Sequence, residues 1–202
     1  MVRQSVGVRV DPTDHQVSVS DADLATIAEQ LGREPRGVIE VSFYTPDGRP
    51  AVIKTSPRLP DGTPFPTLYY LTDPRLTAEA SRQESAGVMK QMTARLVTDS
   101  ELAAAYRRAH ESYLAERDEL EPLGTDFSGG GMPDRVKCLH VLMAHSLAKG
   151  PGVNPLGDEA VALAAEQGLR GSAIPEAWPR ATDATDATDG ADGEQGSGGV
   201  AR

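Results

Sequence analysis

The sequence predicts an α+β fold, in which a small antiparallel three-stranded meander packs with about five or six helices. Three patterns support this fold class. An amphipathic helical pattern lies near the N-terminus, alternating β-forming residues follow over about 37–72, and helical periodicity with capping signals fills most of the rest. This order favours α+β over a parallel α/β arrangement, in which strands and helices would alternate along the chain.

The first helix is predicted over about 21–31. Ser20 and Asp23 have the spacing of a capping box, and apolar residues then recur at intervals of three and four. The meander comes next. Turn signals at 46–48 and 60–62, each reading Pro-Asp-Gly, separate three β-forming runs. Short turns of this kind join strands that are antiparallel neighbours.

Further helical segments are predicted from residue 74 onward. Asp73-Pro74 and Asn154-Pro155 each offer a side-chain cap followed by proline at the first helical position. Residues 98–101 form another capping box. The predicted helices cover about 74–86, 88–97, 99–121, 133–148 and 155–167, and Pro133 is expected to open the fourth of them.

The chain is expected to form a single α+β domain over 21–175, preceded by an N-terminal extension over 1–20. An acidic, low-complexity tail is predicted over 176–202. From Ala181 onward the sequence consists of three Ala-Thr-Asp triplets followed by glycine, serine and acidic residues. Such a segment has little apolar surface to bury, so it cannot offset the entropy of ordering and is expected to be disordered.

The composition argues against several classes of function. The net charge of −10 disfavours general binding to nucleic acid or to anionic membrane surfaces. No segment approaches the roughly 20 apolar residues that span a bilayer, so no membrane insertion is expected. The single cysteine, Cys138, suits a reducing compartment, and the N-terminus lacks the apolar run of a signal peptide. We therefore expect a cytoplasmic protein.

The stretch 128–160 contains the densest group of functional candidates. A triple glycine precedes the helix that Pro133 is expected to open, and unpaired N–H groups at a helix N-terminus attract anions. The sequence therefore predicts that a small phosphorylated or otherwise anionic ligand is bound, or acted on, at the loop 128–134. The expected ligand-binding residues are Gly130, Gly131, Arg135 and Lys137, supplemented by Lys54 and Arg58 from the meander, and the expected catalytic pair for proton transfer is His145 and Asp134.

The same stretch carries side chains of metal-ligating type. Cys138, His140 and His145 are suitable ligands for zinc. In an intact helix over 133–148, however, His140 would point nearly opposite to the other two, so the three could not share one ion. Cys138 and His140 are therefore expected to be packed core residues, and no metal ligand is assigned. A metal-dependent hydrolase would need ligands from elsewhere, such as Asp73, His110 or Asp158.

Three long phrases carry a family resemblance. They are RGVIEVSFYTPDGRPAVIKTSPRLPDGTPFPTLYYLT, ELAAAYRRAHESYLAERD and GGMPDRVKCLHVLMAHSLAKGPGVNPLGDEA. Over about residues 21–170 the chain resembles an actinobacterial family of proteins of unknown function, the family numbered 501. The resemblance implies no activity and no cofactor. Genes of this family lie near those for a septum-forming protein and an exopolyphosphatase-like protein, which adds a non-catalytic protein-interaction module linked to cell division as an alternative function.

Overall fold

The computed structural model describes residues 19–125 and 132–181. A first helix, a three-stranded sheet and a run of helices follow one another, so the predicted α+β class is confirmed. The elements are α1 (Asp21–Leu31), β1 (Val38–Tyr44), β2 (Pro50–Thr55), β3 (Tyr69–Leu71), α2 (Pro74–Ser85), α3 (Val88–Thr98), α4 (Ser100–Leu120), α5 (Leu139–Lys149), α6 (Pro155–Ala164) and a π-helical turn, η1 (Ala165–Leu169).

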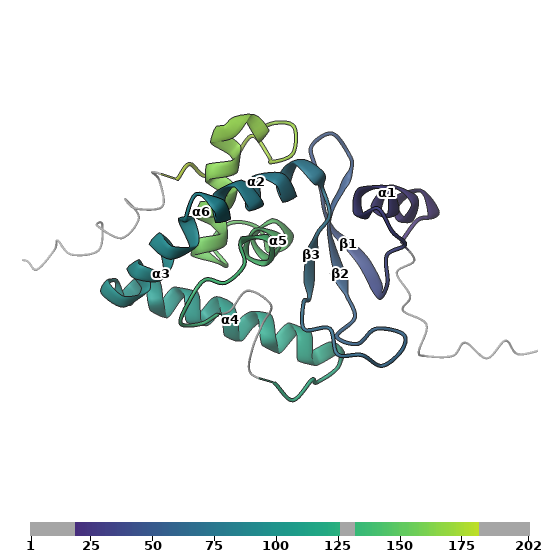
Figure 1. Cartoon of the computed structure of the whole chain (residues 1–202), viewed down its shortest axis with the longest axis horizontal. Helices are drawn as coiled ribbons and strands as arrows, with labels where there is room; N and C mark the ends of the chain where they lie inside the picture. The colour runs from purple at the N-terminus through teal and green to yellow at the C-terminus, as the bar shows by residue number, and fades with distance from the viewer. Residues whose placement is uncertain (1–18, 126–131, 182–202) are drawn as a thin grey trace, which may run out of the picture.

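The sheet separates α1 from the other helices (Figure 1). Its strand order is β1-β2-β3 and both pairings are antiparallel, as the two turn signals predict. β2 lies in the centre, and its residues Ala51, Val52 and Ile53 are buried. β1 is an edge strand whose residues are mostly half-buried. β3 forms the opposite edge of the sheet, which faces the helical body.

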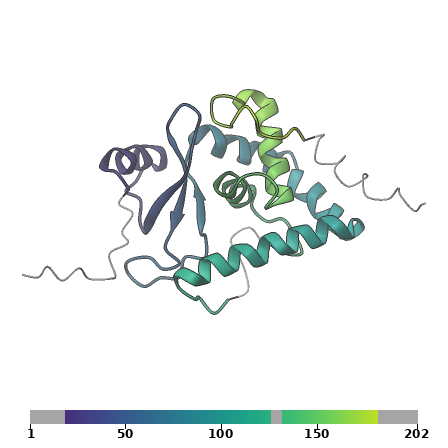
Figure 2. The same ribbon diagram turned by 180° about the vertical axis from the view of Figure 1, so that it is seen from behind.

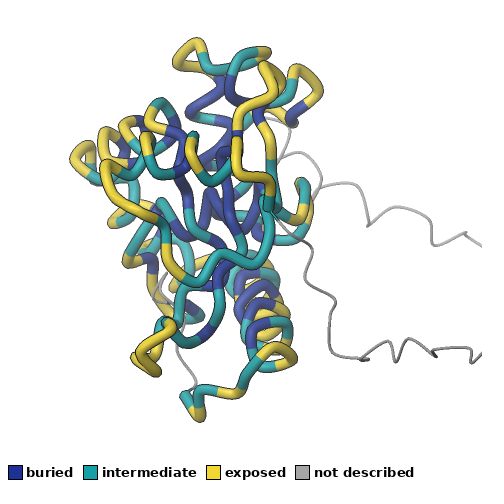
Figure 3. Tube along the Cα trace, turned by 90° about the vertical axis from the view of Figure 1, so that its right-hand side faces the viewer, coloured by how far each residue is buried: buried dark blue, intermediate teal, exposed yellow. Residues whose placement is uncertain are grey.

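α5 lies at the centre of the helical body, where it contacts β3, α2 and α6 (Figure 2). Its sequence is apolar around most of its circumference, which is typical of a helix covered on all sides. The longer α4 runs across one side of this core and buries a stripe that includes Tyr106 and Tyr113. Buried residues accordingly gather in the middle of the molecule, and exposed residues lie on the outer turns (Figure 3).

The predicted N-caps define four helix starts. Ser20, Asp73 and Asn154 each accept a hydrogen bond from a backbone N–H in the first turn of the following helix. At the start of α4 the capping side chain is Asp99, one residue inside the predicted capping box. Each cap satisfies a donor that has no partner within the helix. The starts of α1, α2, α4 and α6 therefore agree with the sequence to within a residue.

The predicted start of α5 at Pro133 is wrong, because the helix begins at Leu139. In a helix from Pro133, the Val136 N–H would bond within its own first turn. It donates instead to the Thr93 hydroxyl of α3, at 3.0 Å. The Leu139 N–H donates to the carboxylate of Glu84 in α2, at 2.7 Å. Side chains of two other helices thus hold the approach to α5 in an irregular path.

The core continues past residue 175, the predicted end of the domain. Trp178 is buried, and the chain around it is tied back by the Arg170 guanidinium, which donates to the Trp178 carbonyl at 2.6 Å. Ala181 also packs against the core. The folded part therefore includes the first residues of the predicted tail. Residues 182–202 and the extension over 1–18 lie outside the described residues.

Candidate functional site

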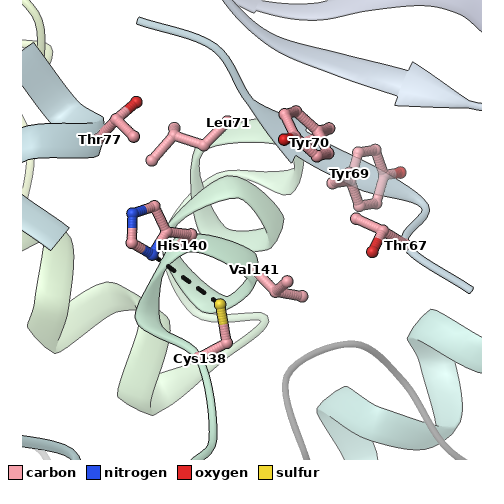
Figure 4. A pocket seen from close by; sticks show the side chains of 8 residues that line it. All are labelled: Thr67, Tyr69, Tyr70, Leu71, Thr77, Cys138, His140 and Val141. Carbon is pink, nitrogen blue, oxygen red and sulfur yellow. Dashed lines mark hydrogen bonds between the residues drawn. The ribbon is translucent and has the colours of Figure 1, made fainter. Parts of the chain in front are cut away.

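A pocket of about 420 Å³ opens between β3, α2 and the start of α5 (Figure 4). The segment that contains β3 forms one wall, with two tyrosine rings and Leu71. Cys138 and His140 approach from the start of α5. The volume is within the range that holds small molecules. The lining consists of Thr67, Tyr69, Tyr70, Leu71, Thr77, Cys138, His140 and Val141.

Three metal-ligating side chains meet beside this pocket. Cys138 Sγ lies 3.9 Å from His140 Nδ1, and Glu84 Oε1 lies 3.1 Å from the same nitrogen. The three ligand atoms all lie within 4.8 Å of one another. Each residue is half-buried, so the cluster is neither sealed in the core nor fully solvated. We refer to these residues as the Glu84–Cys138–His140 cluster.

The start of α5 brings Cys138 and His140 together. Cys138 is the extended residue before the helix, and His140 is the second helical residue. Cys138 packs against the core, as predicted, but the continuous helix from 133 on which the prediction for His140 rested does not form. Each is half-buried and lines the pocket. Glu84 arrives from the last turn of α2 and is fixed by the Leu139 N–H.

Each nitrogen of the His140 ring has a partner. Nδ1 faces Cys138 and Glu84, and Nε2 lies 3.3 Å from the hydroxyl of Ser81, which sits one turn before Glu84 on α2. Contact with the Cys138 sulfur, followed by the hydrogen bond to Glu84, raises the pKa of His140 to about 9. In the metal-free protein the ring is thus protonated at neutral pH, and an ion that binds Nδ1 must displace that proton.

The geometry of the cluster fits a tetrahedral zinc ion. With the usual zinc–sulfur, zinc–nitrogen and zinc–oxygen bond lengths, neighbouring ligand atoms lie about 3.4–3.6 Å apart. The observed separations of 3.1 and 3.9 Å from His140 Nδ1 require shifts of only a few tenths of an ångström, and the third pair of ligand atoms, from Cys138 and Glu84, lies within 4.8 Å. Three protein ligands would leave one position open, as in catalytic zinc sites. Ser81 and the Leu139 N–H provide the outer hydrogen bonds that usually orient zinc ligands.

His145 lies apart from this cluster, in the core. Its ring stacks on Tyr69 with centroids 5.8 Å apart and meets the Tyr113 ring edge-on at 5.2 Å. Its Nδ1 lies 3.3 Å from the Asn154 amide. Burial lowers the pKa of His145 to about 4, so its imidazole is neutral near pH 7. These contacts give His145 a role in packing.

The structure does not bring the predicted catalytic pair together. His145 has no exposed surface, whereas the Asp134 side chain is 78% exposed and forms an ion pair with Arg107 at 2.8 Å. The two residues do not share one helical face, because Asp134 precedes the start of α5.

The predicted anion-binding residues are also dispersed. Lys54 is paired with Glu116 at 2.8 Å and Arg58 with Glu121 at 2.7 Å, so carboxylates of the α4 region occupy both cations. Arg135 and Lys137 are exposed in the segment before α5. Gly130 and Gly131 lie outside the described residues.

Distance along α4 separates the basic residues of the meander from those before α5. The Arg135 carbonyl accepts a hydrogen bond from Tyr106, whereas Lys54 contacts Glu116. At a rise of 1.5 Å per residue, these two positions on α4 lie about 15 Å apart. Arg135 and Lys54 therefore contact different parts of α4, and a small ligand shared by the two stays a prediction.

The fold and the pocket define an α+β protein with a cluster of metal-ligating side chains beside a pocket. The family described as "Protein of unknown function (DUF501)" matches residues 41–162, which is more than half of the chain, and the chain belongs to this family. The matched segment includes the whole Glu84–Cys138–His140 cluster. Neither a curated protein nor a solved structure matches the chain. Among the described residues, no helix combines the length and apolarity needed to cross a membrane.

Proposed function

We propose that this protein is a metal-dependent hydrolase, with zinc held by Glu84, Cys138 and His140 and a small substrate bound in the adjoining pocket. The observation that carries the proposal is the convergence of a sulfur, a nitrogen and a carboxylate oxygen within 4.8 Å. A mixed set of this kind suits zinc better than magnesium or calcium, which prefer oxygen ligands.

The position of the cluster beside a pocket favours a catalytic role over a structural one. Structural zinc sites usually have four protein ligands, whereas catalytic sites have three and leave a position for water or substrate. Two of the three residues here, Cys138 and His140, also line the pocket. Zinc with an open position polarises a bound carbonyl and lowers the pKa of water. A reducing cytoplasm, the location expected from the composition, would keep the Cys138 thiol available.

Metal content tests the first half of this proposal. We expect the purified full chain to bind one equivalent of zinc, measured by elemental analysis after dialysis. Cys138→Ala and Glu84→Gln should each weaken zinc affinity by at least tenfold, because each removes one of three ligands. Glu111→Gln, which changes an exposed carboxylate on α4, is the matched control and should bind zinc normally. Substoichiometric zinc that is insensitive to both cluster substitutions would contradict the site.

Hydrolysis tests the second half. We expect the zinc-loaded chain to hydrolyse activated esters at a rate that disappears on chelation and returns with added zinc. Cys138→Ala should lack this rate, while Glu111→Gln should retain it. A chain that binds zinc stoichiometrically but shows no zinc-dependent hydrolysis would contradict the assignment as a hydrolase and favour a structural ion.

Binding of an anion beside α5 is a second candidate function. Arg135 and Lys137 are exposed, and neither forms an ion pair with any residue of the described ranges. A thermal-shift series with phosphate, nucleotides and polyphosphate tests this function, because a ligand at 100 times its Kd stabilises the fold by about 2.7 kcal/mol. The shift should be lost in the Arg135→Ala, Lys137→Ala double variant. If neither zinc nor any anion binds, the interaction module linked to cell division is the remaining function.

A further inference from the structure

The lining of the pocket indicates what kind of molecule would reach the metal. We infer that the substrate is a small uncharged ester or amide with an apolar, ring-sized group, rather than a phosphorylated or carboxylated compound. The inference rests on the proposed hydrolase function. Hydrolysis of such a substrate breaks the acyl C–O or C–N bond, forms a C–OH bond from water and passes the proton of that water to the leaving alcohol or amine.

The first support is that the described residues place no ionised side chain in the pocket wall other than the metal ligands. Apart from the ligands Cys138 and His140, the lining residues are all uncharged. An ionised group that leaves water for such a wall loses its hydration without gaining a counter-charge. Apolar atoms and rings gain from the same transfer. The uncharged residues are Thr67, Tyr69, Tyr70, Leu71, Thr77 and Val141.

The second support is that Lys54 of β2 and Arg75 of α2 already have partners. The phenol of Tyr69 donates to Glu116 at 2.5 Å, and Lys54 pairs with the same carboxylate. Tyr69 therefore directs its hydroxyl to Glu116, and its ring contributes to the pocket wall. On the α2 side, Arg75 is paired with Asp73 at 2.8 Å. These ion pairs leave neither cation free to hold an anionic substrate.

The third support is the charge of the metal centre itself. A thiolate from Cys138 and a carboxylate from Glu84 together cancel the two positive charges of Zn²⁺, whereas three neutral histidines would leave both charges uncompensated. The centre described here therefore offers little long-range attraction to an anion. Polarisation of a carbonyl acts at bonding distance and does not require a net positive charge.

Esters of 4-nitrophenol with different acyl groups provide the test, because they share one chromophore. Zinc-loaded full chain is given the benzoate, acetate and hemisuccinate esters and 4-nitrophenyl phosphate. After correction for the rates with hydroxide, we expect kcat/KM for the benzoate ester to exceed that of the acetate ester by at least tenfold. The kcat/KM for the benzoate ester should also exceed the kcat/KM for the negatively charged hemisuccinate ester by a similar factor. The phosphate should not be hydrolysed.

Placing a cation at the rim of the pocket should change this preference. Thr77→Lys adds a positive charge at a half-buried lining position, and we expect it to raise the ratio of hemisuccinate to benzoate hydrolysis by at least tenfold. Thr67→Lys, on the opposite wall, is a second variant with the same expected direction. Lys90→Ala, in which an exposed charge on α3 outside the pocket is removed, is the control and should leave the ratio unchanged.

The outcomes separate the two proposals. Zinc-dependent hydrolysis in which the charged esters match or exceed the benzoate ester would overturn the substrate class and leave the hydrolase intact. Stoichiometric zinc without hydrolysis of any ester, or failure to bind zinc, would overturn the hydrolase and with it the inference. Zinc-dependent preference for the benzoate ester, altered by Thr77→Lys or Thr67→Lys, supports both.

Discussion

The surroundings of His145 strongly control its ionisation. The rings of Tyr69 and Tyr113 cover it, Asn154 contacts Nδ1, and Nε2 has no hydrogen-bond partner within the described residues. Glu116 and Lys149 are charged groups that act on the imidazole, and their effects on its pKa oppose each other. Burial away from water is therefore the main cause of the shift, and it lowers the pKa of His145 to about 4.

This environment predicts a loss of stability in mild acid. In the unfolded chain the pKa of His145 returns to about 6.5, so between pH 6.5 and 4 the unfolded state binds more protons than the folded state. The free energy of unfolding should therefore fall as the pH falls through this window, by roughly 3 kcal/mol in total. Urea denaturation at a series of pH values between 7 and 4 measures this slope.

His145→Gln provides the comparison, because glutamine has no proton to gain. Between pH 6.5 and 4, the free energy of unfolding of this variant should change less steeply with pH than that of the parent chain. The difference in slope should correspond to nearly one bound proton. Glu116 adds to the slope of both proteins at the acid end of this window: burial alone would raise its pKa from 4.5, but hydrogen bonds from Lys54, Tyr69 and Lys149 lower it to about 2. Equal slopes in the two proteins would show that His145 is not the group responsible.

At the scale of single residues, the sequence predicts some roles and not others. The residue types of Cys138 and His140 mark them as candidates, but their convergence depends on where α5 begins. Glu84 carries no local signal, because one glutamate among many acidic residues of the chain looks ordinary. Only the packing of α2 against α5 places its carboxylate beside the imidazole. Local sequence patterns cannot predict a site whose ligands come from separate helices.

The contact between α5 and α6 depends on one glycine. A Cβ atom at Gly157 would lie 2.4 Å from the Leu142 carbonyl oxygen and 2.4 Å from the Ser146 hydroxyl. The carbonyl belongs to the backbone of α5 and cannot rotate away. Glycine at this position therefore allows the first turn of α6 to approach α5 closely enough to bury Leu156 and Val161.

Gly157→Ala should separate the two helices. Overpacking in a dense core typically costs about 1–3 kcal/mol, and we expect a value near the upper end because the clash involves backbone. Thermal or urea unfolding measures the change. Gly87→Ala is the matched control: its added methyl meets nothing within 4 Å, so only the positive φ of +84° opposes it, at a cost of about 1 kcal/mol. Equal losses in the two variants would contradict the close-approach explanation.

Helix starts illustrate how far local chemistry predicts an element. Asp73 and Asn154 cap α2 and α6 as expected, because the side chain and the N–H groups it satisfies lie in one turn. Pro133 is an equally good signal for a helix start, but the helix begins six residues later, at Leu139. Thr93 and Glu84, which are far away in sequence, bind the N–H groups of Val136 and Leu139. Tertiary hydrogen bonds outweigh local preference at this position.

Across the whole molecule, Glu116 joins α4 to the rest of the fold. Its carboxylate accepts hydrogen bonds from Lys54 of β2, Tyr69 of β3 and Lys149 of α5. The Lys54 and Glu116 side chains are only 15% and 20% exposed, so solvent screens their interaction weakly. One carboxylate thus connects the sheet, the central helix and the long helix.

Glu116→Ala should therefore destabilise the fold by roughly 2–3 kcal/mol, mainly because it leaves the Lys54 ammonium and the Tyr69 hydroxyl without this acceptor. Urea unfolding at pH 7 measures the loss. Arg107→Ala is the contrasting variant, since its ion pair with Asp134 has side chains that are 56% and 78% exposed. It should cost less than about 1 kcal/mol. Similar effects of the two substitutions would contradict the role given to Glu116.

The overall topology follows from the sequence more fully than the packing does. Two Pro-Asp-Gly turns and three β-forming runs are sufficient to predict the order β1-β2-β3. The position of α5 between β3, α2 and α6 has no comparable local signal. The pocket forms where α2, β3 and the start of α5 meet, so its location depends on that packing.

An ion in the Glu84–Cys138–His140 cluster would act as a clamp between α2 and the start of α5. Glu84 meets Cys138 and His140 only after folding, so the unfolded polypeptide keeps at most two of the three ligands close together. Cells starved of zinc should then yield a protein that opens locally at this junction and is cut by proteases there first. Trace-metal supply during expression would govern the yield of intact protein as well as its chemistry.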